Sequence, residues 1–477
     1  MNIPSDSGPF HIIGIGGIGM SAIAEVLAAR GFVVQGSDMN ESANVIRLRE
    51  MGIRVFIGHD AINLIGARNV VVSTAIKADN PELKAAREKG ISIVSRANML
   101  SELMRGNRSV SVTGTHGKTT TTSMIGHLFE HAGVDPTVVN GGIIEDWGSN
   151  ARLGKGDWMI VEADESDGTF THLPTEIGVV TNIDAEHLDY YGSLSAMHAA
   201  FRRFFQQIPF YGSAVTCIDH PVVRQFVEEE FAPKNQRVLT YGRSDDADVR
   251  LMDVKPQDGN MIFDVELSDN VPGGARRFER MRLPMPGEYN VINALAAIAV
   301  SAEAGIEDEK IIEGLMSFGG ISRRFTPTGQ WNGVSFYDDY AHHPVEIGAV
   351  LNAAKEASSG RVIAIVQPHR YSRLKELFAE FCRCFGRADM VIVAPVYAAG
   401  EAPIEGADHI ALAEGIQKSG HGHVMTIDGE SELAPLIDEL AQSGDLVIGL
   451  GAGSVSQWSH GLPDWLSSMP RKAQRAV

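Results

Sequence analysis

The chain has 477 residues, 44% of them hydrophobic and 21% charged, which is the balance of a globular protein and excludes a disordered or fibrous one. Its 60 acidic and 41 basic side chains leave a net charge of −19, which argues against a protein that binds nucleic acid through a basic face. Three cysteines are too few for a disulfide framework and no apolar run is long enough to span a membrane, so we expect a cytoplasmic protein of about two to four domains.

Short apolar segments alternate with helical patterns through the first hundred residues. This rhythm predicts parallel strands that are joined by crossover helices. A helix is expected over Met20–Arg30, and the expected strands are His11–Ile13, Val33–Val34, Arg54–Phe56, Val70–Val72 and Ile91–Val94. The polar break Arg105–Asn107 interrupts the rhythm, so we place the first domain at residues 1–107.

The rhythm resumes after this break, with strands expected at Ser109–Val112, Trp158–Ala163, Gly178–Asn182, Ala214–Ile218 and Val238–Tyr241. A different pattern follows, in which alternating segments separated by Gly and Asp predict a small antiparallel sheet over Val249–Leu251, Met261–Leu267 and Phe278–Leu283. Two helices are expected next, over Tyr289–Gly305 and Asp308–Phe318. We place this second domain at residues 108–323.

The junction Ile321–Pro327 leads into a third domain, residues 324–477, where strand and helix patterns alternate again. Its expected strands are Ser335–Tyr337, Val362–Val366, Met390–Ala394, His423–Ile427 and Leu446–Leu450. The last residues, Pro470–Val477, are polar and basic, and we expect them to be frayed.

A glycine cluster follows the first predicted strand. Gly14, Gly16 and Gly19 form a G-x-G-x-x-G pattern that opens a helix, where a diphosphate can approach the backbone and the unpaired amides of the helix N-terminus. Asp38 ends the next strand, and in dinucleotide enzymes an acid at this place binds a ribose hydroxyl. The pattern indicates the diphosphate of some nucleotide, with a glycine turn that binds nothing as the alternative.

A second glycine loop is more specific. Residues 114–120 read G-T-H-G-K-T-T between a strand and a helix. Backbone amides of such a loop wrap a β-phosphate, Lys118 can reach the β and γ oxygens, and the Thr119 hydroxyl can bind Mg²⁺. The loop departs from the standard Walker motif, which has glycine where this chain has Val112.

Acidic side chains follow two consecutive predicted strands of the second domain. Glu162–Asp167 ends one strand in a group of carboxylates, which suit Mg²⁺, although we expect at least one of Asp164, Glu165 and Asp167 to be merely solvated. His187 follows the next strand in the run 182–189, at the edge of a parallel sheet where ligands bind. A surface histidine without a ligand is the alternative.

Taken together, these segments resemble the Mur ligases, three-domain enzymes of peptidoglycan synthesis that form amide bonds with ATP. The resemblance covers nearly the whole chain and is carried by residues 14–21, 114–122, 162–167, 182–192, 290–293, 323–325, 338–344 and 367–373. It implies an α/β fold with a Rossmann-like N-terminal domain, a central P-loop ATPase-type parallel sheet with a small antiparallel sheet, and a Rossmann-like C-terminal domain.

The resemblance also implies roles for individual residues. The implied catalytic residues are Lys118, Glu162, His187 and Arg324, and the implied metal ligands are Thr119, Glu162 and His187. The ATP contacts are Gly114, Thr115, His116, Gly117, Lys118, Thr119, Thr120, Asn290, Asn293, Arg324 and Asp339. The UDP-substrate contacts are Gly14, Gly16, Gly17, Ile18, Gly19, Met20, Ser21, Asp38 and Ser73. The amino-acid contacts are His343, His369, Arg370 and Arg373.

The reaction implied is the ligation of L-alanine to the lactyl carboxylate of UDP-N-acetylmuramate through an acyl phosphate, with ADP and phosphate as products. ATP and two Mg²⁺ ions, which Mn²⁺ can replace, are the implied cofactors. The protein is then a monomer or a weak homodimer without nucleic-acid or membrane partners, and it serves cell-wall biogenesis, cell shape and cell division. Many Mur ligases carry a carbamylated lysine near their second metal; none stands between His187 and Pro209, where the chain has Arg202 and Arg203.

Four other functions remain open. A nicotinamide dehydrogenase explains the first glycine cluster but not the loop 114–119, and a nucleotide-gated scaffold explains both sites without chemistry. The murein-tripeptide recycling ligase shares the second loop, but the start of the chain and residues 367–373 favour the alanine-adding branch. Folylpolyglutamate synthase lacks a domain that corresponds to residues 1–107.

Overall fold

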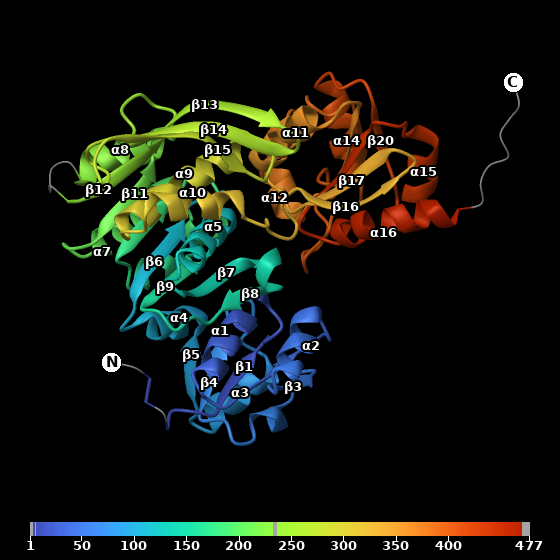
Figure 1. Cartoon of the computed structure of the whole chain (residues 1–477). Helices are drawn as coiled ribbons and strands as arrows, with labels where there is room; N and C mark the ends of the chain where they lie inside the picture. Colours follow the sequence, from blue (N-terminus) through green and yellow to red (C-terminus); the bar gives the residue numbers. More distant parts are fainter. Residues whose placement is uncertain (1–2, 5, 232–235, 470–477) are drawn as a thin grey trace, which may run out of the picture. The chain divides into compact units, whose positions relative to one another are not determined.

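The computed structural model describes residues 3–4, 6–231 and 236–469, and the frayed tail expected over Pro470–Val477 lies outside them. Three β-sheets follow one another along the chain, each with helices on its faces. Figure 1 shows the first sheet in blue, the second in cyan to yellow-green and the third in orange to red. The predicted α/β fold with three successive sheets is therefore confirmed.

The first sheet is entirely parallel, in the order β3-β2-β1-β4-β5. Its strands are β1 (Phe10–Ile13), β2 (Val34–Asp38), β3 (Arg54–Ile57), β4 (Asn69–Val72) and β5 (Ser92–Ser95), and its helices are α1 (Ile18–Ala29), α2 (Ala43–Glu50), α3 (Pro81–Glu88) and α4 (Arg96–Met104). The strand order reverses between β1 and β4, and such a reversal opens a crevice at the carboxyl edge of a parallel sheet. The glycine cluster, Asp38 and Ser73 all follow strands at this edge.

The second sheet has the order β15-β14-β13-β12-β11-β10-β6-β9-β7-β8. Its strands are β6 (Arg108–Thr113), β7 (Thr137–Ile144), β8 (Ser149–Arg152), β9 (Trp158–Glu162), β10 (Ile177–Val180), β11 (Ser213–Cys217), β12 (Val238–Gly242), β13 (Val249–Gln257), β14 (Asn260–Leu267) and β15 (Arg276–Leu283). The helices are α5 (Lys118–His131), α6 (Leu188–Tyr191), α7 (Leu194–Gln207), α8 (Pro221–Phe226), α9 (Glu288–Glu303) and α10 (Asp308–Met316).

The three strands expected as a small antiparallel sheet appended to the parallel one are β13, β14 and β15, and they extend the second sheet beyond β12. One feature of this sheet differs from the expectation. The hairpin of β7 and β8 was not predicted, because Asn140, Gly141 and Gly142 interrupt the apolar pattern of β7. This hairpin extends the sheet beyond β9.

The third sheet has the order β16-β17-β21-β18-β19-β20, with only β16 antiparallel to its neighbour. Its strands are β16 (Thr326–Trp331), β17 (Val334–Asp339), β18 (Val362–Val366), β19 (Met390–Val393), β20 (Val424–Thr426) and β21 (Leu446–Leu450). The helices are α11 (Pro344–Ala357), α12 (Tyr371–Glu376), α13 (Phe378–Phe381), α14 (His409–Lys418), α15 (Leu433–Leu440) and α16 (Val455–Ser468). The unpredicted β16 contains Pro327 and Gly329, which are tolerated because the strand lies at an edge.

The chain divides into two compact units. One contains the chain up to Val254 with Phe263–Arg282 and Ile292–Gly319; the other contains Lys255–Ile262, Leu283–Val291 and the chain from Gly320. The first unit holds the first sheet and most of the second, and one apolar cluster runs through both, from Leu27 on α1 to Val139 and Ala151 on β7 and β8. No helix in the described part of the chain is long and apolar enough to cross a membrane.

Candidate active site

The loop between β6 and α5 has the geometry that a phosphate requires. Gly114 and Gly117 both have positive φ angles, +129° and +83°, which disfavour side chains. A β-carbon on Gly114 would fall on the Thr181 hydroxyl, and one on Gly117 would fall on the Asn293 amide oxygen. The backbone therefore approaches its neighbours as closely as glycine allows, and α5 begins directly at Lys118.

The neighbouring strand β10 holds this loop in place. The Thr181 hydroxyl donates to the carbonyl oxygen of His116 over 2.6 Å, and the Asn182 amide donates to the same oxygen over 3.0 Å. The Asn182 side-chain oxygen accepts the backbone N–H of His116 at 2.8 Å. Because β10 pairs directly with β6, the segment after β10 reaches the loop at the carboxyl edge of the sheet.

Lys118 is fixed beside the loop by hydrogen bonds. Its ammonium donates to the carbonyl oxygens of Gly114 at 2.6 Å and Thr115 at 3.0 Å, and to a carboxylate oxygen of Glu165 at 2.9 Å. Burial opposes the charge on Lys118, but the carboxylates of Glu165 and Asp164 outweigh this and raise the pKa of the ammonium. Lys118 is therefore a positive charge at the place where the loop would wrap a phosphate.

Glu165 is the buried acid of the group that follows β9. It is 2% exposed, and burial raises its pKa to about 8 against the opposing charge of Lys118. Its neighbours Asp164 and Asp167 are instead held by Arg96 of α4, each at 3.3 Å. We expected at least one acid here to be merely solvated; these two are ion-paired.

A candidate cation site is formed by Glu165, Glu186 and His187. One ligand atom from each lies within 4.8 Å of the others, and the His187 Nε2 is 3.7 Å from Glu165 Oε1 and 3.9 Å from Glu186 Oε2. Among the described residues, the second carboxylate oxygen of Glu165 is buried without a hydrogen-bond partner. A buried carboxylate oxygen in this state suits a divalent cation.

The other two predicted metal ligands, Glu162 and Thr119, do not belong to this cluster. Glu162 ends β9, and one of its carboxylate oxygens accepts the backbone N–H of Gly141 at 2.7 Å. Its charge contributes to the raised pKa of Lys118, so it belongs to the same electrostatic environment. Thr119 is buried at the second position of α5.

The first glycine cluster forms the turn between β1 and α1. The backbone N–H of Gly16 donates to Asp38 at 2.9 Å, and the other carboxylate oxygen of Asp38 accepts the N–H of Asn40 at 3.2 Å. Asp38 therefore fastens the glycine turn to the end of β2, a role that the sequence did not indicate. In the following turn Ile18 is 41% exposed, whereas Met20 is buried.

The remaining predicted contacts of the UDP substrate surround this turn. Ser21 is buried, and its hydroxyl donates to the carbonyl oxygen of Ile18 at 2.9 Å. Ser73 is half-buried directly after β4, the neighbour of β1. Exposed backbone at Gly17 and a half-buried hydroxyl at Ser73 thus share one edge of the first sheet.

Three of the predicted amino-acid contacts gather after β18. The His369 ring stacks on Tyr397, with centroids 5.4 Å apart and planes 10° apart, and His369 Nδ1 lies 3.5 Å from Arg373 Nη1. Arg370 lies 3.5 Å from a carboxylate oxygen of Glu401. Burial, together with His342 and Arg373, lowers the pKa of His369 to about 4, so the ring is neutral at pH 7.

His343 has a different structural role. It is the N-cap of α11, where its Nδ1 accepts the backbone N–H of Val345 at 3.3 Å and Glu346 completes a capping box. The histidine ring that contacts His369 is that of His342, with centroids 5.9 Å apart. Sequence reasoning thus missed His342, which lies in the motif 338–344, and Tyr397, which is three residues beyond the strand predicted over Met390–Ala394.

The predicted ATP contacts beyond the loop lie in α9 and around β17. Asn293 packs against Gly117, while Asn290, one turn earlier, donates to the carbonyl oxygen of Pro286 at 2.7 Å. Asp339 is 1% exposed and accepts the backbone N–H groups of Phe325 and Ala341, each at 2.7 Å. Burial raises its pKa to about 6, against the opposing charge of Arg324.

Three family models match the chain in sequence: the Mur ligase family catalytic domain over residues 9–108, the Mur ligase middle domain over 112–301, and the Mur ligase glutamate ligase domain over 323–453. Two relatives also match nearly the whole chain. The UDP-N-acetylmuramate–L-alanine ligase of Bradyrhizobium sp. strain BTAi1 is 55% identical over 98% of this chain and 100% of its own. That of Xanthobacter autotrophicus is 56% identical over 98% of this chain and 99% of its own. The chain belongs to the Mur ligase family.

Solved Mur ligase structures share the fold. The crystal structure of UDP-N-acetylmuramate–alanine ligase from Thermotoga maritima matches with a TM-score of 0.81 at 28% identity, covering 96% of this chain and 99% of that one. A murein peptide ligase from Psychrobacter arcticus matches with a TM-score of 0.70 at 22% identity, covering 97% and 99%. The resemblance to the Mur ligases inferred from the motifs is therefore confirmed.

Two acids of the candidate cation site, Glu165 and Glu186, were not among the predicted metal ligands. Glu165 lies in the predicted acidic group after β9, and Glu186 immediately precedes His187. Both could have been found as the acids next to a lysine loop, but spacing alone does not say which carboxylate turns inward. Arg202, in the region where many family members have the carbamylated lysine, pairs with Glu229 at 2.8 Å.

Proposed function

We propose that this Mur ligase joins L-alanine to the lactyl carboxylate of UDP-N-acetylmuramate at the expense of ATP, a step of peptidoglycan synthesis. Relatives at about 55% identity over nearly the whole length carry the name of this activity. The observation that carries the proposal is the loop 114–117 with Lys118 bonded to Glu165, which forms a candidate cation site with Glu186 and His187. A nicotinamide dehydrogenase has no use for a charged lysine and a cation site together, and phosphate release distinguishes the ligase from a scaffold that only binds ATP.

The chemistry needs an activated carboxylate, because a carboxylate and an amine do not condense unaided in water. Transfer of the γ-phosphoryl group of ATP to a carboxylate oxygen breaks its bond to ADP and creates an acyl phosphate. The amine of L-alanine then attacks the carbonyl carbon, phosphate leaves, and the amine loses a proton. Lys118 and the loop amides are suited to hold the phosphates, and a fixed positive charge stabilises the charge that develops during transfer.

The residues present fit a Mg²⁺ ion. Glu165, Glu186 and His187 would hold it, and the buried, unpartnered oxygen of Glu165 is a ligand of the hard type that Mg²⁺ prefers. When bound, the ion supplies positive charge that offsets repulsion between phosphate and carboxylate oxygens. The family in general uses ATP and Mg²⁺. That two ions bind, that Mn²⁺ can replace them, and that Thr119 and Glu162 also act as ligands are further parts of the proposal.

The proposed amino-acid site is the cluster after β18. Arg373 and Arg370 offer planar forks that match a carboxylate, and a neutral His369 lies beside Arg373. This arrangement supports binding of the L-alanine carboxylate. The contacts proposed for His343, Asn290, Arg324, Asp339 and the UDP-substrate residues rest on the family resemblance.

A phosphate-release assay tests the proposal. The purified protein receives ATP, Mg²⁺, UDP-N-acetylmuramate and each of the twenty amino acids in turn, and we expect release that depends on L-alanine. ATP binding without release under every condition would favour the scaffold, and release only with a murein tripeptide would favour the recycling ligase. A change in NAD(P)H fluorescence without phosphate release would favour the dehydrogenase.

The finer properties complete the proposal. We propose domain boundaries near residues 107 and 323, which agree with the matched ranges of the family models. We also propose a monomer or weak homodimer that acts in the cytoplasm, where ATP is available, with cell shape and cell division depending on its product. Gel filtration with light scattering measures the oligomeric state, and cell fractionation tests the cytoplasmic location.

A further inference from the structure

A polar cavity of about 490 Å³ lies within the first compact unit, where the end of α1 meets the second sheet. Its walls come from the chain after α1, from Gly106 and Asn107 at the junction before β6, and from Thr137 and the turn before β9. Pockets of this volume are large enough for a small metabolite. The first glycine cluster lies at the other end of α1, about 18 Å away for a helix of this length.

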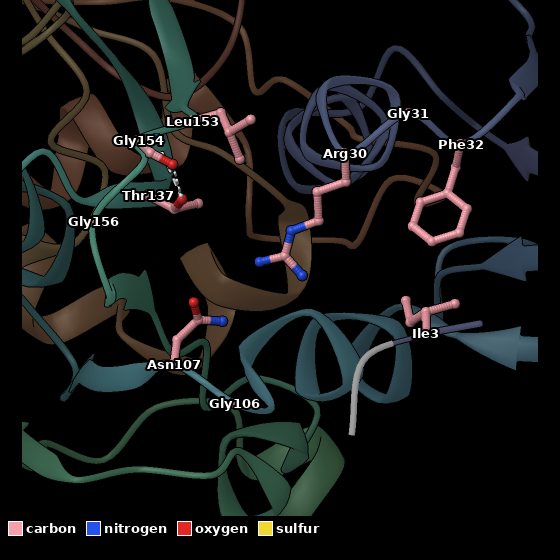
Figure 2. A pocket seen from close by; sticks show the side chains of 10 residues that line it. All are labelled: Ile3, Arg30, Gly31, Phe32, Gly106, Asn107, Thr137, Leu153, Gly154 and Gly156. Carbon is pink, nitrogen blue, oxygen red and sulfur yellow. Dashed lines mark hydrogen bonds between the residues drawn. The ribbon is translucent and has the colours of Figure 1, made fainter. Parts of the chain in front are cut away.

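Arg30 extends into this cavity. Figure 2 shows its side chain leaving the end of α1 and pointing between Asn107 on one side and Thr137 and Gly154 on the other. Arg30 is the only charged side chain among the described residues that line the cavity. In the part of the chain that the structure describes, its guanidinium forms no hydrogen bond and no ion pair.

An unpaired guanidinium that is half-buried is unfavourable. Burial lowers the pKa of Arg30, which reports the loss of water around the charge. Its position just after α1 places it near the negative end of the helix dipole, but that interaction is screened and small. A counter-charge or several hydrogen-bond acceptors are what such a group normally has.

The nearby protein groups do not supply this counter-charge. Asp135, in the turn before β7, accepts from Arg152 at 2.7 Å and from the backbone N–H of Lys155 at 2.9 Å. The Asn107 amide donates to the carbonyl oxygens that end α4. Among the described residues of the wall, Thr137 pairs with Gly154 and none carries a carboxylate, so the cavity itself holds no counter-charge for Arg30.

The wall across Arg30 from Thr137 is apolar. Ile3 and Phe32 line it, and Figure 2 shows both on the other side of Arg30 from Thr137, whereas Leu153 lies beside Gly154. A ligand that pairs with Arg30 and also packs against the apolar wall therefore carries an oxyanion at one end and apolar atoms at the other.

We propose that this cavity binds a small organic anion whose carboxylate or phosphate group pairs with Arg30 and whose apolar part packs against Ile3 and Phe32. The planar fork of arginine matches either group with two parallel hydrogen bonds. The site is separate from the phosphate loop, since none of residues 114–119 lines the cavity. Bound there, the anion would bridge the end of α1 and the second sheet.

A local fluorescence titration tests the proposal. Lys155 is exposed next to the cavity, so Lys155→Cys in a Cys384→Ser background provides a single accessible thiol for an environment-sensitive dye. The probes are phenyl phosphate, phenylacetate and neutral 2-phenylethanol. We expect saturable binding of at least one of the two anions, with the alcohol binding at least tenfold more weakly. Saturation by phenyl phosphate alone identifies the phosphate class, and saturation by phenylacetate alone the carboxylate class.

Variants locate the anion at Arg30. Arg30→Met should weaken anion binding about tenfold or more. Arg30→Lys keeps the charge but loses the fork, so its affinity should lie between those of the parent and Arg30→Met. Arg87→Met is the matched control, because Arg87 also ends a helix but is exposed on α3, and Lys118→Ala controls for the phosphate loop. Both should bind like the parent. Equal binding by Arg30→Met and the parent, equal binding of the alcohol, no saturation by either anion, or loss of binding in Lys118→Ala would overturn the proposal.

Discussion

The Lys118→Ala substitution removes the ammonium that contacts Gly114, Thr115 and Glu165 and leaves the phosphate loop without its cation. Loss of one such contact to developing charge costs about 3–4 kcal/mol, which corresponds to a rate reduction of about 10²–10³-fold. We therefore expect ligation to become undetectable or nearly so, because the ammonium that lies against the loop is lost.

The same substitution tests the structural role of the pair. Removing one partner of a buried ion pair costs about 3–5 kcal/mol when the other charge stays buried, and Glu165 is 2% exposed. Because the raised pKa of Glu165 lets it take up a proton, we expect the lower end, about 3 kcal/mol. Adding Glu165→Gln removes the carboxyl group that must otherwise be protonated, so the double variant should regain stability but not ligation.

The assay is phosphate release by purified variants, with urea unfolding followed by circular dichroism. Lys310→Ala is the control, because Lys310 also pairs with a glutamate, Glu313 at 2.9 Å, but both side chains are exposed. This control should retain both activity and stability. Near-normal turnover of Lys118→Ala would refute the assignment of the phosphate loop, and an unchanged unfolding midpoint would refute the stabilising role of the pair.

Three further substitutions probe other parts of the site. Arg373→Lys keeps the charge but loses the fork, so the KM for L-alanine should rise about tenfold or more while the acyl phosphate still forms and is trapped by borohydride; weakened UDP-N-acetylmuramate binding with an unchanged alanine KM would contradict this role. Gly117→Ala places a β-carbon on the Asn293 amide at a φ of +83°, so ATP affinity should fall at least about tenfold, and a parent-like KM for ATP would be inconsistent with the loop geometry. Asp339 has a pKa raised to about 6, so the folded state keeps a proton that the unfolded chain has lost, and the free energy of unfolding should fall as pH rises from about 4 to about 6. Asp339→Asn should remove up to about 3 kcal/mol of this pH dependence, whatever its effect on absolute stability. If the free energy of unfolding, measured in urea, changes with pH in the variant as it does in the parent, the raised pKa of Asp339 is disproved.

Local chemistry of the chain was sufficient to predict the elements that carry the phosphate loop. A strand, a turn with two glycines and a helix are consecutive in sequence, so the place of Lys118 at the start of α5 followed from the pattern alone. The same reasoning predicted the glycine turn before α1 and the α/β character of all three sheets. It failed at β7, β8 and β16, where Gly or Pro weakens the strand pattern and pairing with a neighbouring strand decides the conformation.

Only the tertiary structure decided which side chains meet. The order β10-β6-β9 brings Glu165 to Lys118, although Glu162 in the same acidic group was the expected metal ligand, because the turn after β9 directs successive side chains differently. The stacking of His369 on Tyr397 likewise depends on the pairing of β18 with β19. Such contacts join residues far apart in sequence, and their free energy is gained only once strand order and register are set, which is why spacing along the chain does not reveal them.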